Sequence, residues 1–250
     1  MQLEGHTILI TGGGTGIGLA LAQALVQKQN TVIICGRRME KLEAAKQETP
    51  ELHTIQCDVA NPEECRELFE RLSAEFPQLS ILVNNAGTGA KAWFRDGVVD
   101  MTEIRNTIAT NLTAPVELSA LLLPLLQAQP KAAVVNVSSV LAYLPLAGSA
   151  VYCATKSALH SFTQALRIDL TSTTVQVFEV MPPAVDTDML KGYEGPSLTP
   201  EFTAEQIVQG MEKDEYEMRI GQTNYAYWLS RIAPGYILKL MHKAMDKKKE

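Results

Sequence analysis

The sequence predicts one α/β domain, a doubly wound parallel sheet of seven strands with helices on both faces. Short apolar runs rich in β-branched residues alternate with helical patterns along the 250 residues. Strands that are apolar on both sides and alternate with helices are typical of a parallel sheet covered on both faces. We predict strands at 6–11, 31–35, 53–57, 81–84, 133–137, 175–180 and 217–220, and helices at 17–29, 39–48, 62–75, 102–127, 150–171 and 204–213.

The composition argues against several classes of protein. The net charge of −6 disfavours a nucleic-acid-binding protein, because such domains are usually basic. The four cysteines have no paired spacing and the four histidines no zinc-binding pattern, so we expect neither disulfides nor a metal. No basic leader precedes the first apolar run, and polar residues interrupt the uncharged stretch 132–155, which we interpret as a buried strand, a loop and the start of a helix. We expect a cytoplasmic protein without a transmembrane segment.

A glycine-rich turn joins the first predicted strand to the first predicted helix. It is Thr11-Gly12-Gly13-Gly14-Thr15-Gly16-Ile17-Gly18, a T-G-x-x-x-G-x-G pattern that differs from the usual G-x-G-x-x-G. Backbone N–H groups and the positive helix end at such a turn bind phosphate, and glycines allow its close approach. A flexible turn without a ligand is the alternative. The position of the turn favours a Rossmann-type fold, in which this segment binds a dinucleotide.

The second predicted strand ends in a sequence that bears on the choice of nucleotide. Cys35-Gly36-Arg37-Arg38 lacks the acidic residue that binds the ribose of NAD, and Arg37 offers a planar fork for the 2′-phosphate of NADP. Two solvated arginines at the start of the next helix are the alternative. The sequence therefore favours NADP(H) over NAD(H).

A serine, a tyrosine and a lysine form a candidate proton-transfer site. Tyr152 and Lys156 are four residues apart, so they share one face of a predicted helix, and Ser139 follows the fifth strand. Bringing a phenol of pKa ~10 to 7 requires roughly 4 kcal/mol. An ammonium group ~4–5 Å away, at an effective dielectric constant of ~20, supplies about that much. We therefore expect Lys156 to acidify Tyr152 while Ser139 binds a carbonyl oxygen.

Pro115 falls inside the long predicted helix at 102–127. Proline has no N–H for the carbonyl four residues earlier and crowds it, and that carbonyl belongs to Asn111. We expect a kink that leaves the Asn111 carbonyl available to a water in a proton chain reaching Lys156. A plain proline kink is the alternative.

The chain resembles the short-chain dehydrogenase/reductase family over about residues 5–190. The resemblance rests on the glycine turn, Asn84-Asn85-Ala86-Gly87, Asn111, Ser139 and the Tyr152–Lys156 pair, in the family's order. It implies that Tyr152 is the general acid/base, Ser139 the carbonyl-oxygen ligand, Lys156 the ribose ligand and Asn111 a relay residue. The implied nucleotide-binding residues are Gly12, Gly14, Thr15, Gly16, Ile17, Gly18, Arg37, Arg38, Asp58, Val59, Asn85, Ala86, Gly87, Tyr152, Lys156, Pro182, Val185 and Thr187.

Two departures from common family patterns matter. Pro182-Pro183 replaces the more usual Pro-Gly after the sixth strand, which stiffens the loop on the nicotinamide side. Thr15 stands where NADP-using relatives often carry Arg or Lys, which weakens the preference for NADP. The Pro-Pro pair, the Cys-Gly-Arg sequence and an Arg-Ile-Ala-Pro segment near the end resemble the bacterial DltE-type branch of the family.

A mostly apolar set of side chains is expected on the substrate side, beneath a lid at about 186–202. Its members are Trp93, Phe94, Leu141, Tyr143 and Met189. The set predicts a pocket for a hydrophobic carbonyl or alcohol; ordinary loop packing is the alternative.

The carboxy-terminal segment differs from the rest of the chain. We divide the chain into a dinucleotide-binding and catalytic part, 1–222, and a helical extension, 223–250. The extension is apolar with basic ends, and residues 231–250 carry a net charge of +4. Such a segment packs on its own domain or on a partner subunit, or lies on anionic lipid as a peripheral membrane contact. We expect a homodimer or homotetramer.

The function predicted from these features is an NADP(H)-dependent oxidoreductase that interconverts a carbonyl and an alcohol. A nucleotide-binding sensor or scaffold with the same fold is the alternative, although it needs no acid such as Tyr152. An epimerase or dehydratase is disfavoured because such relatives usually have a larger carboxy-terminal lobe.

Overall fold

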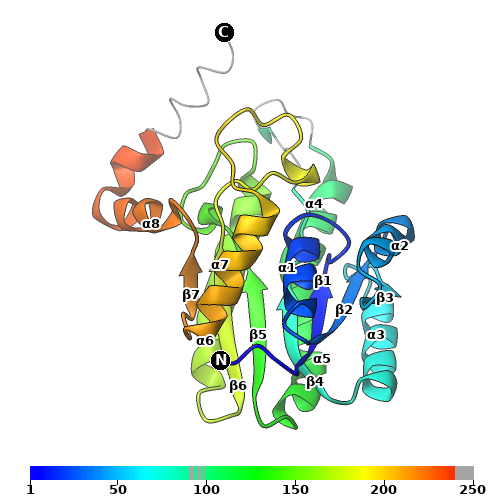
Figure 1. Ribbon diagram of the computed structural model, residues 1–250. Helices are drawn as coiled ribbons and strands as arrows, with labels where there is room; N and C mark the ends of the chain where they lie inside the picture. Colours follow the sequence, from blue (N-terminus) through cyan, green and yellow to red (C-terminus); the bar gives the residue numbers. More distant parts are fainter. Residues whose placement is uncertain (90–92, 95–96, 98, 240–250) are drawn as a thin grey trace.

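A computed structural model describes residues 1–89, 93, 94, 97 and 99–239 and shows one parallel sheet between two layers of helices (Figure 1). The seven strands are β1 (Thr7–Thr11), β2 (Thr31–Gly36), β3 (His53–Gln56), β4 (Leu79–Asn84), β5 (Ala132–Val137), β6 (Val175–Met181) and β7 (Glu217–Arg219). Their order in the sheet is β3-β2-β1-β4-β5-β6-β7, and every pair is parallel. The predicted seven-stranded, doubly wound sheet is confirmed.

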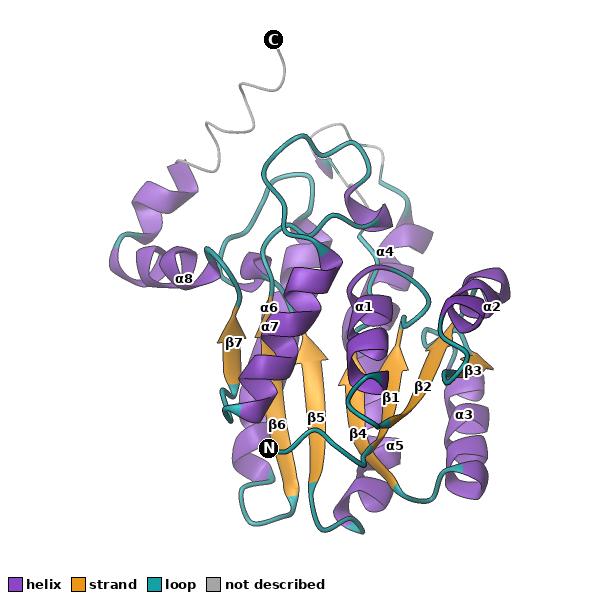
Figure 2. Ribbon diagram, viewed as in Figure 1, coloured by secondary structure: helices purple, strands orange, loops and turns teal. Residues whose placement is uncertain are grey.

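The helices divide between the two faces of the sheet (Figure 2). On one face lie α1 (Gly16–Val26), α2 (Met39–Glu48) and α7 (Pro200–Glu212), and on the other α3 (Pro62–Glu75), α5 (Ala114–Gln127) and α6 (Ala150–Asp169). The central strands bury side chains on both faces, which explains their continuous apolar sequences. Strand order reverses between β1 and β4, and in such sheets ligands bind beyond the carboxyl ends of the strands at that point.

The long helix predicted at 102–127 is interrupted. It consists of α4 (Met101–Ile108), a π-helical turn (Ala109–Thr113) and α5, and the Ala114 N–H bonds to the carbonyl five residues earlier, that of Ala109. The wider turn accommodates Pro115, which cannot donate to the Asn111 carbonyl. The disturbance expected at Pro115 is therefore present, and it takes the form of a π-helical turn within the predicted helical range.

The helical run Met101–Gln127 is long and apolar enough to cross a membrane, with a mean hydropathy of 1.4 over eighteen of its residues. Four of its residues, Ala114, Leu118, Leu122 and Leu126, are spaced by one turn and buried against the sheet. A helix that covers a sheet has the same apolar composition, so the composition of this run is weak evidence for a membrane-spanning helix. The uncharged stretch 132–155 forms β5, a loop and the start of α6, as predicted.

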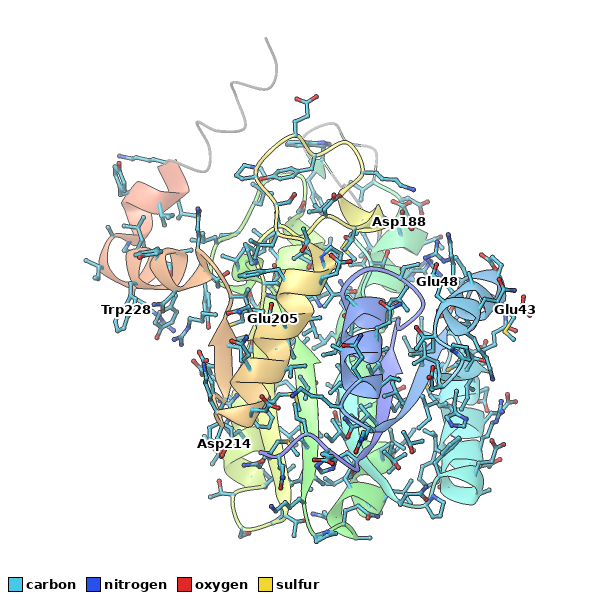
Figure 3. The ribbon with its side chains drawn as sticks, in the orientation of Figure 1. Glu43, Glu48, Asp188, Glu205, Asp214 and Trp228 are labelled. Carbon is cyan, nitrogen blue, oxygen red and sulfur yellow. The ribbon has the colours of Figure 1, made fainter. Side chains whose placement is uncertain are left out.

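Helix α8 (Thr223–Ile232) lies beyond the carboxyl end of β7, at the edge of the fold. On its inner side, the Tyr227 ring contacts the Tyr143 ring at 5.0 Å and lies 3.9 Å from the Arg219 guanidinium carbon. Tyr225, Trp228 and Ile232 are exposed, and Figure 3 shows Trp228 on the outer side of the helix. Residues 240–250, with most of the basic tail, lie outside the described residues.

Candidate active site

The glycine turn between β1 and α1 fits tightly against the segments that follow β4 and β6. Gly16 has φ +58°, and a Cβ there would lie 2.9 Å from Thr187 Cγ2. A Cβ at Gly18 would lie 2.5 Å from both Asn85 Nδ2 and the Gly12 carbonyl oxygen. The first residues of α1 receive no side-chain cap from Thr15, so backbone N–H groups at this helix end remain available. The turn therefore offers the uncapped backbone N–H groups that a phosphate site requires.

Thr11 joins the glycine turn to the Asn85-Ala86 segment. Its buried Oγ1 accepts hydrogen bonds from the backbone N–H groups of Asn85 (3.0 Å) and Ala86 (2.9 Å). In return, Asn85 Nδ2 donates to the carbonyls of Thr11 (2.9 Å) and Gly12 (3.2 Å). The glycine turn and the Asn85-Ala86-Gly87 segment, more than seventy residues apart in sequence, thus lie side by side.

Replacing Thr11 with valine is expected to destabilise the protein by about 1–3 kcal/mol, because two N–H groups lose their acceptor. Thr11→Ser keeps the hydroxyl and serves as the matched control. Urea unfolding of both variants measures the effect. Equal midpoints for the valine and serine variants would show that the hydroxyl does not stabilise the turn.

The residues predicted to select the nucleotide lie at the ends of β2 and β3. Arg37 and Arg38 are exposed, and Arg37 makes no ion pair with any residue that the structure describes. Asp58 Oδ1 accepts the Ala60 N–H at 3.0 Å, and Val59 is buried. This edge presents two guanidinium groups that are available to an anion.

Asn111 is buried in the π-helical turn, and its amide group is fully engaged. Its Oδ1 accepts the Thr88 N–H, and its Nδ2 donates to the Thr88 carbonyl, both at 2.8 Å. Nδ2 also lies 3.2 Å from Thr155 Oγ1 on α6. The Asn111 side chain therefore connects the segment after β4 to the helix that carries Tyr152 and Lys156.

Ser139, Tyr152 and Lys156 come together at the carboxyl end of β5. Ser139 lies two residues after the strand, and its Oγ accepts the Leu141 N–H at 3.1 Å. On α6, Lys156 Nζ lies 5.7 Å from the centre of the Tyr152 ring and donates to the Val137 carbonyl at 2.8 Å. The shared helical face that the four-residue spacing predicted is present.

The electrostatics of the pair differ from the sequence-based expectation. Burial raises the pKa of Tyr152 to about 12, although a hydrogen bond with the Ser139 side chain opposes the shift. Burial also lowers the pKa of Lys156 to about 8, opposed by the negative charge of Glu179. In this state desolvation outweighs the attraction between phenolate and ammonium. Tyr152 is therefore a protonated phenol at neutral pH and is suited to donate a proton.

Sequence reasoning missed a buried acid next to this site. Glu179 on β6 is fully buried and is bonded to Ser138 and His160. The sequence contained a signal, since Glu179 is the one charged residue in the strand Val175–Met181, and buried charges require partners.

The loops predicted to form the substrate side are partly placed. Met189 lies against the backbone near the site. Its Cε lies 3.7 Å from where a Cβ of Gly87 would be, and its Sδ lies 3.9 Å from where a Cβ of Gly89 would be. Trp93 lies over Gly148, where a Cβ would come within 2.8 Å of the indole ring. Phe94 is exposed and Leu141 partly buried. Residues 90–92, 95, 96 and 98 of this region lie outside the described residues.

Tyr143 faces away from these residues and toward α8. Its hydroxyl donates to Met181 Sδ at 2.9 Å, and its ring contacts those of His160 and Tyr227, both at 5.0 Å. The Tyr143 side chain therefore packs against other side chains of the protein, and these contacts do not place it in the predicted substrate pocket.

The segment predicted as a lid is attached to the core at both ends. Near its start, the Asp186 N–H bonds to the Leu198 carbonyl at 2.8 Å, and the Leu198 N–H to the Ala184 carbonyl at 2.9 Å. Between them, Asp188 lies above the carboxyl ends of the strands (Figure 3). Its pKa is lowered by a hydrogen bond from Lys191 and, further away, by Lys41 and Arg38. The segment therefore extends over the side of the site where the nucleotide is predicted to bind.

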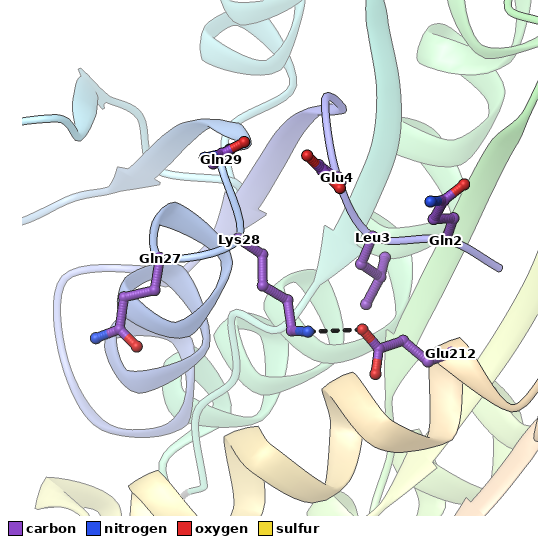
Figure 4. A pocket seen from close by; sticks show the side chains of 7 residues that line it. All are labelled: Gln2, Leu3, Glu4, Gln27, Lys28, Gln29 and Glu212. Atoms are coloured by element: carbon purple, nitrogen blue, oxygen red, sulfur yellow. Dashed lines mark hydrogen bonds and ion pairs between the residues drawn. The ribbon is translucent and has the colours of Figure 1, made fainter.

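The hollow shown in Figure 4 is distinct from this site. It is bordered by residues 2–4, 27–29 and Glu212, and the Lys28–Glu212 ion pair (2.7 Å) crosses it. It lies at the amino end of β1, whereas the predicted catalytic residues lie at the carboxyl ends of the strands. The hollow contains none of the predicted site residues.

Comparison with known proteins shows the family and the fold type of the chain. A sequence model of the short chain dehydrogenase family matches residues 6–195. The chain is 49% identical over 189 residues (76% of this chain, 75% of the relative) to the uncharacterized oxidoreductase DltE of Bacillus subtilis (strain 168). It is 31% identical over 195 residues (75% and 74%) to the NADP-dependent 3-hydroxy acid dehydrogenase of Schizosaccharomyces pombe. The crystal structure of a short chain dehydrogenase from Burkholderia cenocepacia J2315 in complex with NADP has a TM-score of 0.86 at 23% identity, covering 96% of this chain and 99% of that chain.

The chain belongs to the short-chain dehydrogenase family, a class of NAD(P)-dependent oxidoreductases. Within that family it is similar to the DltE-type oxidoreductases, the branch that the Pro-Pro loop suggested.

Proposed function

We propose that this protein is an NADP(H)-dependent oxidoreductase that interconverts a carbonyl group and an alcohol. The observation that carries the proposal is the convergence of Ser139 with Tyr152 and Lys156, which share one face of α6, at the carboxyl end of β5. A nucleotide sensor needs the glycine turn, but it does not need a protonated phenol beside a serine hydroxyl and a buried lysine.

The residues present fit a dinucleotide. The glycine turn, with its close approaches at Gly16 and Gly18 and its uncapped helix end, would hold the diphosphate. Arg37 and Arg38 would bind a 2′-phosphate, and Asp58 and Val59 would contact the adenine. Toward the nicotinamide end we place Asn85, Ala86, Gly87, Pro182, Val185 and Thr187. When bound, the nicotinamide supplies or accepts the hydride.

The chain's own residues handle the proton and the substrate oxygen. Ser139 donates a hydrogen bond to the carbonyl oxygen and so orients it, and Tyr152 gives its proton to that oxygen. The ammonium group of Lys156 stabilises the phenolate left on Tyr152 and orients the ribose hydroxyls. Because burial raises the pKa of Tyr152 to about 12, the phenol is protonated at neutral pH, which favours carbonyl reduction.

Apolar side chains around the site indicate the substrate class. Met189 lies close to Gly87 and Gly89, and Trp93, Phe94 and Leu141 come from neighbouring loops. We propose a hydrophobic carbonyl or alcohol as substrate, with residues 186–202 as a cover over it.

The direct test is oxidation of NADPH and NADH against a panel of aldehydes, ketones and quinones. Loss of reduced-nicotinamide absorbance that depends on the carbonyl supports the proposal. Tight nucleotide binding without turnover on any member of the panel favours a sensor instead.

The proposed nucleotide preference has its own test in Arg37→Ala. Loss of a guanidinium–phosphate contact is expected to weaken NADPH binding about tenfold or more and to leave NADH binding nearly unchanged. Titration calorimetry with both nucleotides measures this, with Lys46→Ala on the exposed side of α2 as control. Equal losses for the two nucleotides would mean that Arg37 does not contact a 2′-phosphate.

A further inference from the structure

Glu179 is an ionisable residue in the middle of the protein that the proposed mechanism does not use. It lies on β6, next to Asn136 on β5 and Glu217 on β7, and none of its surface is exposed. Ser138 Oγ donates to Oε1 at 2.5 Å, and His160 Nδ1 lies 2.7 Å from Oε2. Because a carboxylate only accepts hydrogen bonds, we assign the ring proton to Nδ1. Both carboxylate oxygens are thus held by side chains from different elements.

The two partners of Glu179 are direct neighbours of the proposed catalytic residues. Ser138 immediately precedes Ser139 at the end of β5. His160 follows Lys156 by four residues and Tyr152 by eight on α6, so the three share one helical face. The carboxylate therefore links the strand end that carries Ser139 to the helix that carries Tyr152 and Lys156.

Glu179 also acts on the charge of Lys156. The lysine is buried, and Glu179 is the charged group that opposes the desolvation of its ammonium group. Other titratable or charged groups lie around the pair: Tyr152 and His160 on α6, Tyr143 in the loop after β5, and Glu217 and Arg219 on β7. Glu217 is already paired with Arg167 and Arg219, so its charge is compensated.

We propose that Glu179, with Ser138 and His160, positions the catalytic residues of this enzyme and keeps Lys156 charged. The carboxylate fixes Ser139 relative to Tyr152 through two hydrogen bonds and supplies the negative charge that a buried ammonium requires. The catalytic part of this inference rests on the proposed carbonyl–alcohol function; the effect on the Lys156 charge does not.

Glu179→Gln is the central variant, because it keeps the size of the side chain and an acceptor for Ser138 but removes the charge. For carbonyl reduction, the alkaline limb of kcat/KM is expected to move down by at least ~1 pH unit, since the ammonium group is lost earlier. We expect kcat to fall about tenfold and the substrate KM to change less than about twofold. Glu179→Asp restores the charge and should return the limb toward its wild-type position.

Two further variants separate charge from geometry. Ser138→Ala removes one hydrogen bond and leaves the carboxylate, so kcat should fall without a shift of the alkaline limb. Glu217→Gln on the adjacent strand removes a carboxylate that is paired elsewhere, and it should leave the pH profile unchanged. If Glu179 had only a structural role, these variants would lose stability, but the alkaline limb of kcat/KM would not move in Glu179→Gln.

A second measurement does not depend on any substrate. Urea unfolding of the wild type and Glu179→Gln between pH 7 and 10 reports the charge on Lys156, because only the folded state lowers its pKa. Stability of the wild type should rise with pH above about 8, and in Glu179→Gln the rise should begin at lower pH. If Glu179→Gln fails to fold, the same comparison is made with Glu179→Asp. Its shorter side chain draws the charge back from Lys156, so the rise should begin at a pH below that of the wild type, by less than Glu179→Gln would give.

Superimposed pH curves for wild type and Glu179→Gln, in both activity and unfolding, would overturn the inference. If the wild type reduces no carbonyl while the unfolding curves differ as expected, the proposed function and the positioning role fail, and the effect of Glu179 on the Lys156 charge stands.

Discussion

Tyr152→Phe is expected to lower turnover by about 10²–10⁴-fold, the usual contribution of a general acid. The variant loses only the hydroxyl, and the Tyr152 ring lies beside Lys156 and against Gly89, so the shape of the site should persist. Affinity for NADPH should stay within about twofold, because the diphosphate and the 2′-phosphate are held by other residues. The measurement is kcat with the best carbonyl of the panel, together with calorimetric NADPH binding.

The matched control is Tyr216→Phe. The Tyr216 hydroxyl bonds to Gln176 on β6 at 3.1 Å, and the residue is exposed at the edge of the sheet. This variant should turn over like the wild type. Wild-type rates in Tyr152→Phe would reject Tyr152 as the proton donor.

Lys156→Met is the second variant with a large expected effect, and it acts on both activity and stability. Turnover should fall at least about 10²-fold, because the phenolate on Tyr152 loses the cation that stabilises it. Methionine fills a similar volume without a charge, so the variant should remain folded.

The stability effect of Lys156 has a defined sign. Burial lowers the pKa of its ammonium group from 10.5 to about 8, so charging it in the folded state costs about 3 kcal/mol below pH 8. As pH rises from about 8 to 10.5 the folded protein gives up this proton before the unfolded chain does, and the cost disappears. Stability of the wild type should therefore rise across this window, and that of Lys156→Met should lack the same rise.

Urea unfolding at several pH values between 7 and 10.5 measures this difference. Lys46→Met, at an exposed position on α2, should follow the wild type. Parallel curves for the wild type and Lys156→Met would show that Lys156 has an ordinary pKa in the folded protein.

Local patterns of the sequence were enough to predict much of this structure. Apolar runs alternating with helical segments specify a parallel sheet, and all seven predicted strands are present. The four-residue spacing from Tyr152 to Lys156 fixes a shared helical face whatever the tertiary structure is. The glycine turn, Asn85 and Thr187 lie far apart in the sequence, and local patterns do not predict their contact. The fold type does predict it, because all three follow strands of one parallel sheet.

Other features depend on packing and could not be predicted from local patterns. The pKa of Tyr152 is set by how much water its hydroxyl loses, and the distance estimate from the sequence contained no such cost. Glu179 is 23 residues from Lys156 in the chain, and only the approach of β6 to α6 brings it near. Pro115 indicated a disturbed helix, but the choice of a π-helical turn over a kink depends on how α4 and α5 fit the sheet.

The most direct test of the account is a crystal structure of the protein with NADPH. We expect the diphosphate at Gly12–Gly18, the 2′-phosphate at Arg37, and the nicotinamide ring beside the Tyr152 hydroxyl, with Lys156 Nζ on the ribose. A nucleotide whose nicotinamide end points away from Tyr152, or a dinucleotide bound elsewhere on the chain, would contradict the assignment of this site.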